Sequence, residues 1–115
     1  MQEIYRWSVL ELSSKIRSKE VSVTEVVDAM LERIASTRDT NAFVCTVDDQ
    51  AREAARIAQA AVDKGEPLPV LHGIPYSAKD VTHCKGVPTR SGSRALPAFT
   101  PTEDNLGVAR ARAAG

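Results

Sequence analysis

Lys79 and Asp80 are the residues of this sequence whose types and position are best suited to chemistry. A lysine amine can serve as a base and then as an acid when burial or positive neighbours lower its pKa from the usual value of about 10.4. The residues before Lys79 are mostly apolar, from Ile74 to Ala78. We therefore expect a strand over Tyr76–Val81 that buries the lysine stem and points the amine into a pocket.

The lysine–aspartate pair also has simpler interpretations. Lys79 alone could be a surface lysine whose stem packs while its amine stays in water. A phosphate-binding lysine is set aside, because no second glycine joins Gly73 to Lys79 in the P-loop pattern. Asp80 is either a structural acid that fixes the backbone of a loop or a solvated partner of Arg90 or Arg94.

Three helices are predicted in the first half of the sequence. Capping-box patterns occur at Ser8–Glu11 and Ser22–Glu25, where a serine and a glutamate three residues later each bond the other's backbone N–H. Apolar residues at three-and-four spacing over 23–34 indicate an amphipathic helix. A third helix opens at Asp48-Asp49, carries an alanine-rich stripe, and ends at Lys64-Gly65.

The rest of the sequence is less regular. A β-branched and aromatic run predicts a strand over Asn41–Val47. From Glu66 onward, closely spaced glycine and proline residues indicate a long irregular stretch, and such stretches are usually functional. Regular structure is expected to resume in a helix over 102–115, with Thr102 as its N-cap and two acids in its first turn.

Composition excludes several function classes. Lysine plus arginine and aspartate plus glutamate are equal at 15 each, which argues against a nucleic-acid-binding protein. The first seven residues carry charges and no apolar run, so we expect neither a secretory signal nor a membrane span. Cys45 and Cys84 are too far apart for a zinc site or a disulfide scaffold, which favours reduced thiols in a cytoplasmic protein.

Three segments in order resemble amidase-signature enzymes. Leu71–Asp80 is similar to the family's leucine-x-glycine-(isoleucine/valine)-proline…lysine-aspartate segment. Gly86–Ser93 is similar to the glycine-x-x-threonine-x-x-glycine-serine stretch that follows it. Pro101–Asp104 and the end of the chain, Arg110–Gly115, are similar to the next helix of the family. The three segments fall within 45 residues, while the first 65 residues match the family's helical lead-in more loosely.

The resemblance implies amide hydrolysis by a serine, a second serine on a cis peptide, and a lysine. It assigns the catalytic lysine to Lys79 and supporting roles to Asp80, Thr89, Gly92 and Ser93. Ser93 is not the expected nucleophile, because the resemblance places both catalytic serines further along the chain. It implies no metal and no organic cofactor. The remaining polar candidates, His72, His83 and Cys84, are expected to be loop residues rather than metal ligands.

The predicted fold class is α/β: N-terminal helices plus the first strands of a mixed-sheet α/β/α sandwich, incomplete here. We expect a helical lead-in over 1–65 and the start of the amidase-signature core over 66–115. The chain is expected to be part of a longer enzyme and to be inactive alone.

Several alternatives and partners accompany this prediction. The first alternative is the amidase subunit of a glutamine-dependent aminoacyl-tRNA amidotransferase, and the second is a non-catalytic interaction module. We expect a small-molecule amide substrate for the complete enzyme, no nucleic-acid or membrane partner, and leave a homodimer open.

Overall fold

The computed structural model describes residues 3–97 and 99–115. It divides the chain into two compact units, which are described separately. The helical unit comprises Met1–Pro75 with Gly115, and the loop unit comprises Tyr76–Ala114. Residues 66–75, expected from the sequence to lie with the second part, group with the helices.

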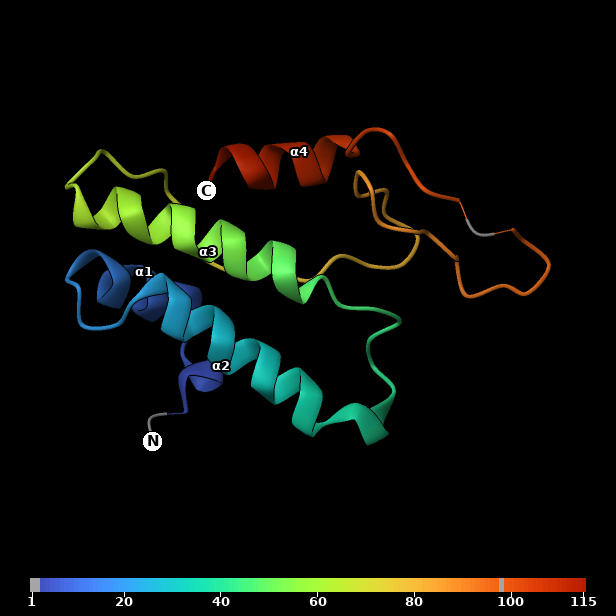
Figure 1. Cartoon of the computed structure of the whole chain (residues 1–115), viewed down its shortest axis with the longest axis horizontal. Coiled ribbons are helices and arrows are strands. Elements are labelled where there is room, and N and C mark those ends of the chain that lie inside the picture. Colours follow the sequence, from blue (N-terminus) through green and yellow to red (C-terminus); the bar gives the residue numbers. More distant parts are fainter. Residues whose placement is uncertain (1–2, 98) are drawn as a thin grey trace. The chain divides into compact units, whose positions relative to one another are not determined.

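The helical unit contains the three helices that the sequence predicts. They are α1 (Val9–Arg17), α2 (Val23–Ser36) and α3 (Asp48–Asp63), accompanied by the short 3-10 turns η1 (Ile4–Arg6) and η2 (Arg38–Thr40). The helix α2 packs against both α3 and η1 (Figure 1). Both predicted capping boxes are present: Ser8 closes the start of α1, and Ser22 closes the start of α2.

The core of the helical unit is built from the inward stripes of these helices. Ile16, Val23 and Val26 are at most 1% exposed. Ala55 brings the small-residue face of α3 into the same cluster, as the alanine stripe predicts. Each fully buried branched side chain contributes about 1.5–3 kcal/mol relative to an exposed one. The buried members of the cluster are Leu12, Ile16, Val21, Val23, Val26, Val27, Ala55 and Val62.

The two capping boxes make the helical unit sensitive to acid. The backbone N–H of Ser22 donates to Glu25 at 2.8 Å, and that bond lowers the pKa of Glu25 from its usual 4.5. The backbone N–H of Ser8 acts in the same way on the pKa of Glu11. A carboxylate whose pKa is lower in the folded than in the unfolded chain stabilises the fold above the unfolded pKa, and this contribution is lost as the pH falls below it.

We therefore expect the helical unit to be less stable at pH 3.5 than at pH 6, in part through these two glutamates. Urea unfolding followed by circular dichroism at 222 nm measures the change. In the double variant Glu11→Gln, Glu25→Gln, the drop in free energy of unfolding between the two pH values should be smaller. Identical pH dependence in the variant and the parent chain would contradict this assignment.

Neither predicted strand forms in the described part of the chain. Residues 41–47 and 76–81 lie outside any helix or strand, and the paired backbone is limited to one isolated antiparallel bridge, Thr89 with Phe99. A strand is stabilised by its ladder with a neighbour, and the described residues supply no neighbour for either segment. The prediction of the first strands of a mixed sheet is therefore not met within residues 3–97 and 99–115.

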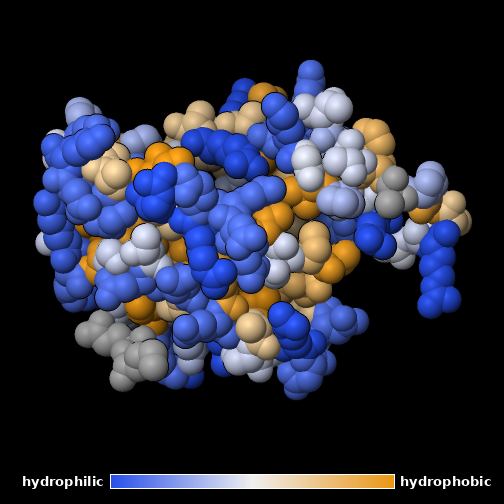
Figure 2. Space-filling view, in the orientation of Figure 1, coloured by the Kyte–Doolittle hydropathy of each residue, from blue (hydrophilic) through white to orange (hydrophobic). Residues whose placement is uncertain are grey.

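Many large apolar side chains remain at the surface (Figure 2). Leu10 is 82% exposed and Val70 is 72% exposed. Both unpaired segments contribute, since every residue from 41 to 47 is exposed and so are Tyr76 and Val81. Within the described residues, no helix is both long and apolar enough to cross a membrane.

The loop unit ends in α4 (Leu106–Ala113), which starts later than the sequence predicts. Asn105 is the N-cap, and its side chain accepts a hydrogen bond from the Val108 N–H at 2.9 Å. Thr102 was the predicted cap, but it lies outside the helix. Asp104, directly before the cap, accepts the Lys85 N–H through its carboxylate and pairs with Arg112 of α4.

Candidate functional site

The segment that leads toward Lys79 is anchored to the helices of the helical unit. Arg17 of α1 donates to the Pro69 carbonyl oxygen at 2.8 Å. The His72 ring and the Ala58 carbonyl oxygen of α3 are 2.9 Å apart, so Nε2–H of His72 is the donor. Ile74 packs against the core cluster. His72 is thus a structural hydrogen-bonding residue in this geometry, in line with its expected place in a turn.

Gly73 fits between the anchored segment and the core. Its φ of +76° lies in the left-handed region, which favours glycine. A Cβ built at this position would lie 2.7 Å from Cγ2 of Val23, closer than real Cβ contacts. The glycine of the Gly73-Ile74-Pro75 motif is therefore required by packing as well as by backbone conformation.

Lys79 is exposed, so the expected burial of this lysine is wrong for the described chain. Residues 74–79 have no assigned secondary structure, and among residues 3–97 and 99–115 no sheet is present to cover the lysine stem. The Thr82 N–H donates to the Lys79 carbonyl oxygen at 2.8 Å, which closes a turn over Lys79–Thr82. Among the described residues, no hydrogen bond or ion pair involves the amine of Lys79.

Asp80 reaches from that turn to a second one, at Arg90–Ser93. Its Oδ1 accepts from the Arg90 backbone N–H at 3.0 Å, and its Oδ2 accepts from the Gly92 backbone N–H at 3.2 Å. The Ser93 N–H donates to the Arg90 carbonyl oxygen at 3.3 Å. Asp80 therefore touches backbone; no ion pair with either nearby arginine occurs in the part of the chain that the structure describes.

The other supporting residues lie at or beside this second turn. Thr89 is 8% exposed and exchanges two backbone hydrogen bonds with Phe99. Gly92 has a φ of +64° and provides the left-handed conformation that the turn needs. Ser93 accepts the Ala95 N–H through its hydroxyl at 3.2 Å, a local bond that closes a short loop. The structure thus brings Asp80 together with the segment 89–93.

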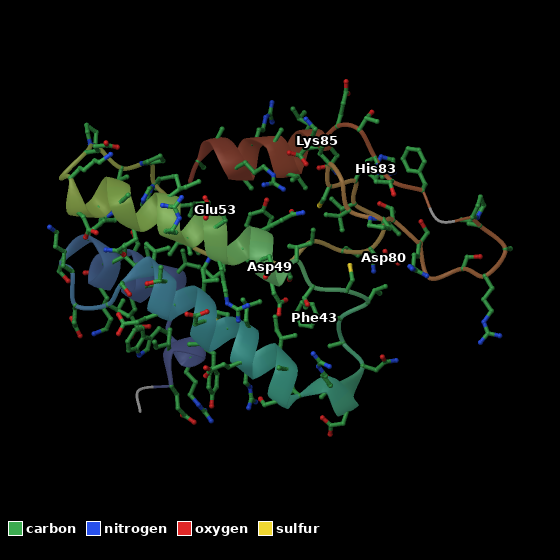
Figure 3. All side chains as sticks on the ribbon, viewed as in Figure 1. Phe43, Asp49, Glu53, Asp80, His83 and Lys85 are labelled. Atoms are coloured by element: carbon green, nitrogen blue, oxygen red, sulfur yellow. The ribbon has the colours of Figure 1, made fainter. Side chains whose placement is uncertain are left out.

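A set of hydrogen bonds that the sequence analysis missed supports the turn. The Gly86 N–H donates to Pro101, and the Asn105 N–H donates to His83, each at 2.9 Å. Asp104 adds a bond to the Lys85 N–H at 2.7 Å and an ion pair with Arg112 at 3.0 Å. Asp80, His83 and Lys85 are labelled along this irregular part of the chain in Figure 3. The acid Asp104 was the one sequence signal that could have predicted these hydrogen bonds.

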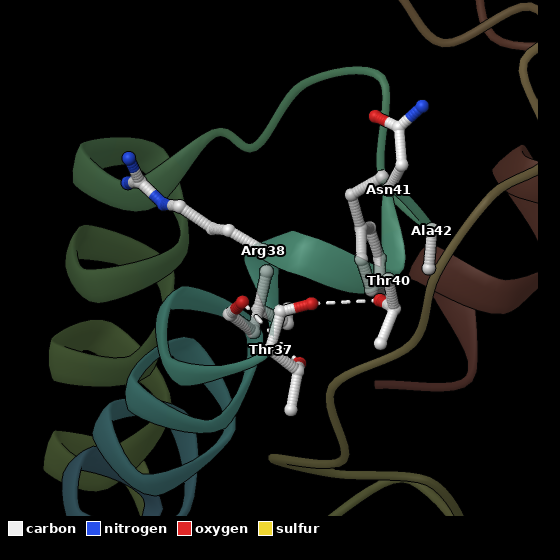
Figure 4. A pocket seen from close by; sticks show the side chains of 7 residues that line it. Thr37, Arg38, Thr40, Asn41 and Ala42 are labelled. Carbon is white, nitrogen blue, oxygen red and sulfur yellow. Dashed lines mark hydrogen bonds between the residues drawn. The ribbon is translucent and has the colours of Figure 1, made fainter.

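The remaining candidates do not converge on a metal or a ligand. The His83 ring lies against the Phe99 ring, with centroids 5.3 Å apart. No group of three or more potential metal-ligating side chains occurs within residues 3–97 and 99–115. A pocket of about 50 Å³ at the end of α2 is lined by residues such as Thr37 and Thr40 (Figure 4). The Thr40 hydroxyl donates a hydrogen bond to the Thr37 carbonyl oxygen.

Known proteins are similar to this chain over almost its whole length. A family model described as Amidase matches residues 25–115. A glutamyl-tRNA(Gln) amidotransferase subunit from Anaeromyxobacter sp. (strain K) is 39% identical over 115 residues, which is 99% of this chain and 23% of that protein. The protein of the same name from Salinispora arenicola (strain CNS-205) is 40% identical over 116 residues, covering all of this chain and 24% of its own length.

Solved structures give a matching result for the fold. A structure described as "An unexpected vestigial protein complex reveals the evolutionary origins of an s-triazine catabolic enzyme" superposes with a TM-score of 0.88 at 33% identity. It covers 95% of this chain and 24% of its own. The inhibitor-bound form of the same complex gives 0.87 at 34% identity. The chain spans about a quarter of the length of the curated relatives that it matches.

Proposed function

The chain belongs to the Amidase family, and from this premise we propose that it forms part of an enzyme that hydrolyses amide bonds, with Lys79 as the catalytic lysine. The observation that carries the proposal is the family match over 25–115, which includes Lys79, Asp80 and the turn at Arg90–Ser93. The three motif segments of the sequence all fall within that match.

Amide hydrolysis requires an activated nucleophile and an acid that protonates the departing amine. In the proposed mechanism a serine from outside residues 1–115 attacks the carbonyl carbon, and its proton passes through a second serine on a cis peptide to the neutral amine of Lys79. The protonated lysine returns this proton to the leaving nitrogen as the C–N bond breaks. Water then hydrolyses the acyl-enzyme by the same relay.

A lysine that accepts protons near neutral pH needs a covered site, because burial or positive neighbours lower the pKa of its amine. Lys79 is exposed in this chain. We therefore propose that other parts of the enzyme cover it and supply strands that pair with 41–47 and 76–81, which completes the α/β/α sandwich. Among the described residues neither segment pairs with a neighbouring strand, and both expose apolar side chains, which supports this arrangement.

A specific observation favours a second candidate, the amidase subunit of a glutamine-dependent aminoacyl-tRNA amidotransferase. Relatives whose name is that of a glutamyl-tRNA(Gln) amidotransferase subunit are 39–40% identical over essentially the whole chain. In this candidate the amide substrate is glutamine, and the enzyme acts together with partner subunits. In the first candidate a free-standing amidase acts on another small amide.

The test uses a hybrid protein in which residues 1–115 replace the matched quarter of the Salinispora relative. Ammonia release is measured from glutamine and from simple aliphatic and aryl amides, with the intact relative as the positive control. We expect the hybrid to release ammonia and the isolated 115-residue chain to remain at background, because the serines lie outside it.

Two results would contradict the proposal. One is amide turnover by the isolated chain above that of its own Lys79→Ala variant. The other is a hybrid that unfolds at the same temperature as the intact relative, with the same helical content, and yet releases no ammonia from any of the amides.

A further inference from the structure

The turn at Arg90–Ser93 has the geometry of an anion-binding backbone turn. Ser91 and Gly92 both have positive φ, at 56° and 64°. Backbone N–H groups around such left-handed residues point toward one side and together favour a negative charge. The group found there is the Asp80 carboxylate, with one oxygen on the Arg90 N–H and the other on the Gly92 N–H. The turn therefore holds an anion that belongs to the chain itself.

We propose that Asp80 is a positioning residue, whose carboxylate is the internal anion that holds this turn and thereby fixes the backbone of Lys79. The catalytic consequence rests on the proposed function; the structural one does not. Asp80 directly follows Lys79, and the Thr82 N–H bond to the Lys79 carbonyl closes the short turn in which Asp80 lies. The backbone of Lys79 thus belongs to one turn, 79–82, which the Asp80 carboxylate connects to the second turn, 90–93.

The charge of Asp80 matters for this role. Hydrogen bonds from N–H groups to a carboxylate are shorter and stronger than bonds between neutral groups. Ser91 is a non-glycine residue with positive φ, a conformation that costs free energy unless its surroundings hold it. The two bonds to Asp80 supply that support. When the carboxylate is removed, both N–H groups lose their acceptor and the turn loses the contacts that oppose relaxation.

The other side of the turn is held by a firm part of the loop unit. The buried Thr89, directly before it, is bonded to Phe99 in both directions. The Gly86 N–H bond to Pro101 and the Lys85 N–H bond to Asp104 extend this support. A group bonded to the turn is therefore bonded to the body of the loop unit, which is what positioning requires.

The structural part is tested in the 115-residue chain by amide hydrogen exchange measured with NMR. In Asp80→Ala we expect exchange at both Arg90 and Gly92 to accelerate about tenfold. In Asp80→Asn, a variant of nearly equal size whose amide oxygen can still accept one N–H, we expect the acceleration at one of the two amides or at both. The Lys85 amide should be unchanged. The matched control, Asp104→Ala, should reverse the order of the effects: it removes the acceptor of the Lys85 N–H and should accelerate Lys85 far more than Arg90 and Gly92, which keep their bonds to Asp80. Unchanged exchange at Arg90 and Gly92 in both Asp80 variants would overturn the proposal.

The positioning part is tested in the hybrid protein by the division of the effect between kcat and KM. We expect Asp80→Asn to lower kcat by roughly 100-fold, as a small misplacement of a catalytic group does, with KM within about twofold. The exposed control Glu103→Ala should leave both constants unchanged. A kcat for Asp80→Asn equal to that of the parent hybrid, while Lys79→Ala abolishes turnover, would overturn positioning alone. An unaffected Lys79→Ala variant would instead remove the proposed function and leave the exchange result standing.

Discussion

Gly73→Ala is expected to lower the free energy of unfolding of the helical unit by about 2–4 kcal/mol. Part of the loss is backbone strain, because the φ of +76° is one that alanine rarely adopts. The rest is packing, because the new Cβ would lie 2.7 Å from Cγ2 of Val23 and 3.4 Å from Cδ1 of Ile16. Both neighbours are 1% exposed and cannot swing into solvent. Overpacked core positions typically cost about 1–3 kcal/mol.

Gly65 offers a matched control for this prediction. Its φ of +69° is nearly the same, but a Cβ there would meet no atom within 4 Å. Gly65→Ala should therefore cost only the backbone strain, roughly 1–2 kcal/mol. Urea unfolding monitored at 222 nm compares the two variants under one condition. Equal losses for Gly65→Ala and Gly73→Ala would contradict the packing of the motif glycine against the helical core.

The helices could be predicted because their signals are local. The capping boxes at Ser8 and Ser22 and the apolar stripe of α2 each lie within a few residues, and the structure confirms them. The first turn of α3 likewise starts at Asp48, as its two acids indicate. Short-range hydrogen bonds and the burial of one face determine these elements, so the sequence pattern alone identifies them.

The predicted strands depend on a distant partner, which a single stretch of sequence does not reveal. Residues 41–47 have the β-branched and aromatic content of a strand, yet they are exposed and unpaired here. The start of α4 was also missed. The sequence analysis placed the N-cap at Thr102, whereas in the structure the Asn105 side chain accepts the Val108 N–H and the helix starts at Leu106.

The candidate site was predictable in its residues but not in its contacts. The motif identifies Lys79 and Asp80, and the family match covers both. The sequence left the partner of Asp80 open between backbone and arginine, because those groups are ten or more residues away. In the structure, the partners of the Asp80 carboxylate are the backbone N–H groups of Arg90 and Gly92. The exposure of Lys79 could not be predicted, since the burial of this side chain depends on which other segments of the enzyme pack against residues 76–81.

Lys79→Ala is expected to lower kcat of the hybrid protein by at least about 1,000-fold, the scale on which removing a member of a catalytic unit acts. The variant lacks both the base that activates the serine and the acid that protonates the leaving amine. Lys79→Arg should be equally impaired, because a guanidinium keeps its proton at all accessible pH values. Stability should change little in either variant, since the side chain is exposed and without a bonded partner in the described chain.

Ammonia release by the hybrid and by its Lys79→Ala and Lys85→Ala variants is the most direct test of the account. Lys85 is an exposed lysine six positions further along, so it controls for the loss of one positive charge in the same unit. The account predicts turnover by the hybrid and by Lys85→Ala, and near-complete loss in Lys79→Ala. Equal turnover in Lys79→Ala and Lys85→Ala would show that Lys79 is not the catalytic lysine.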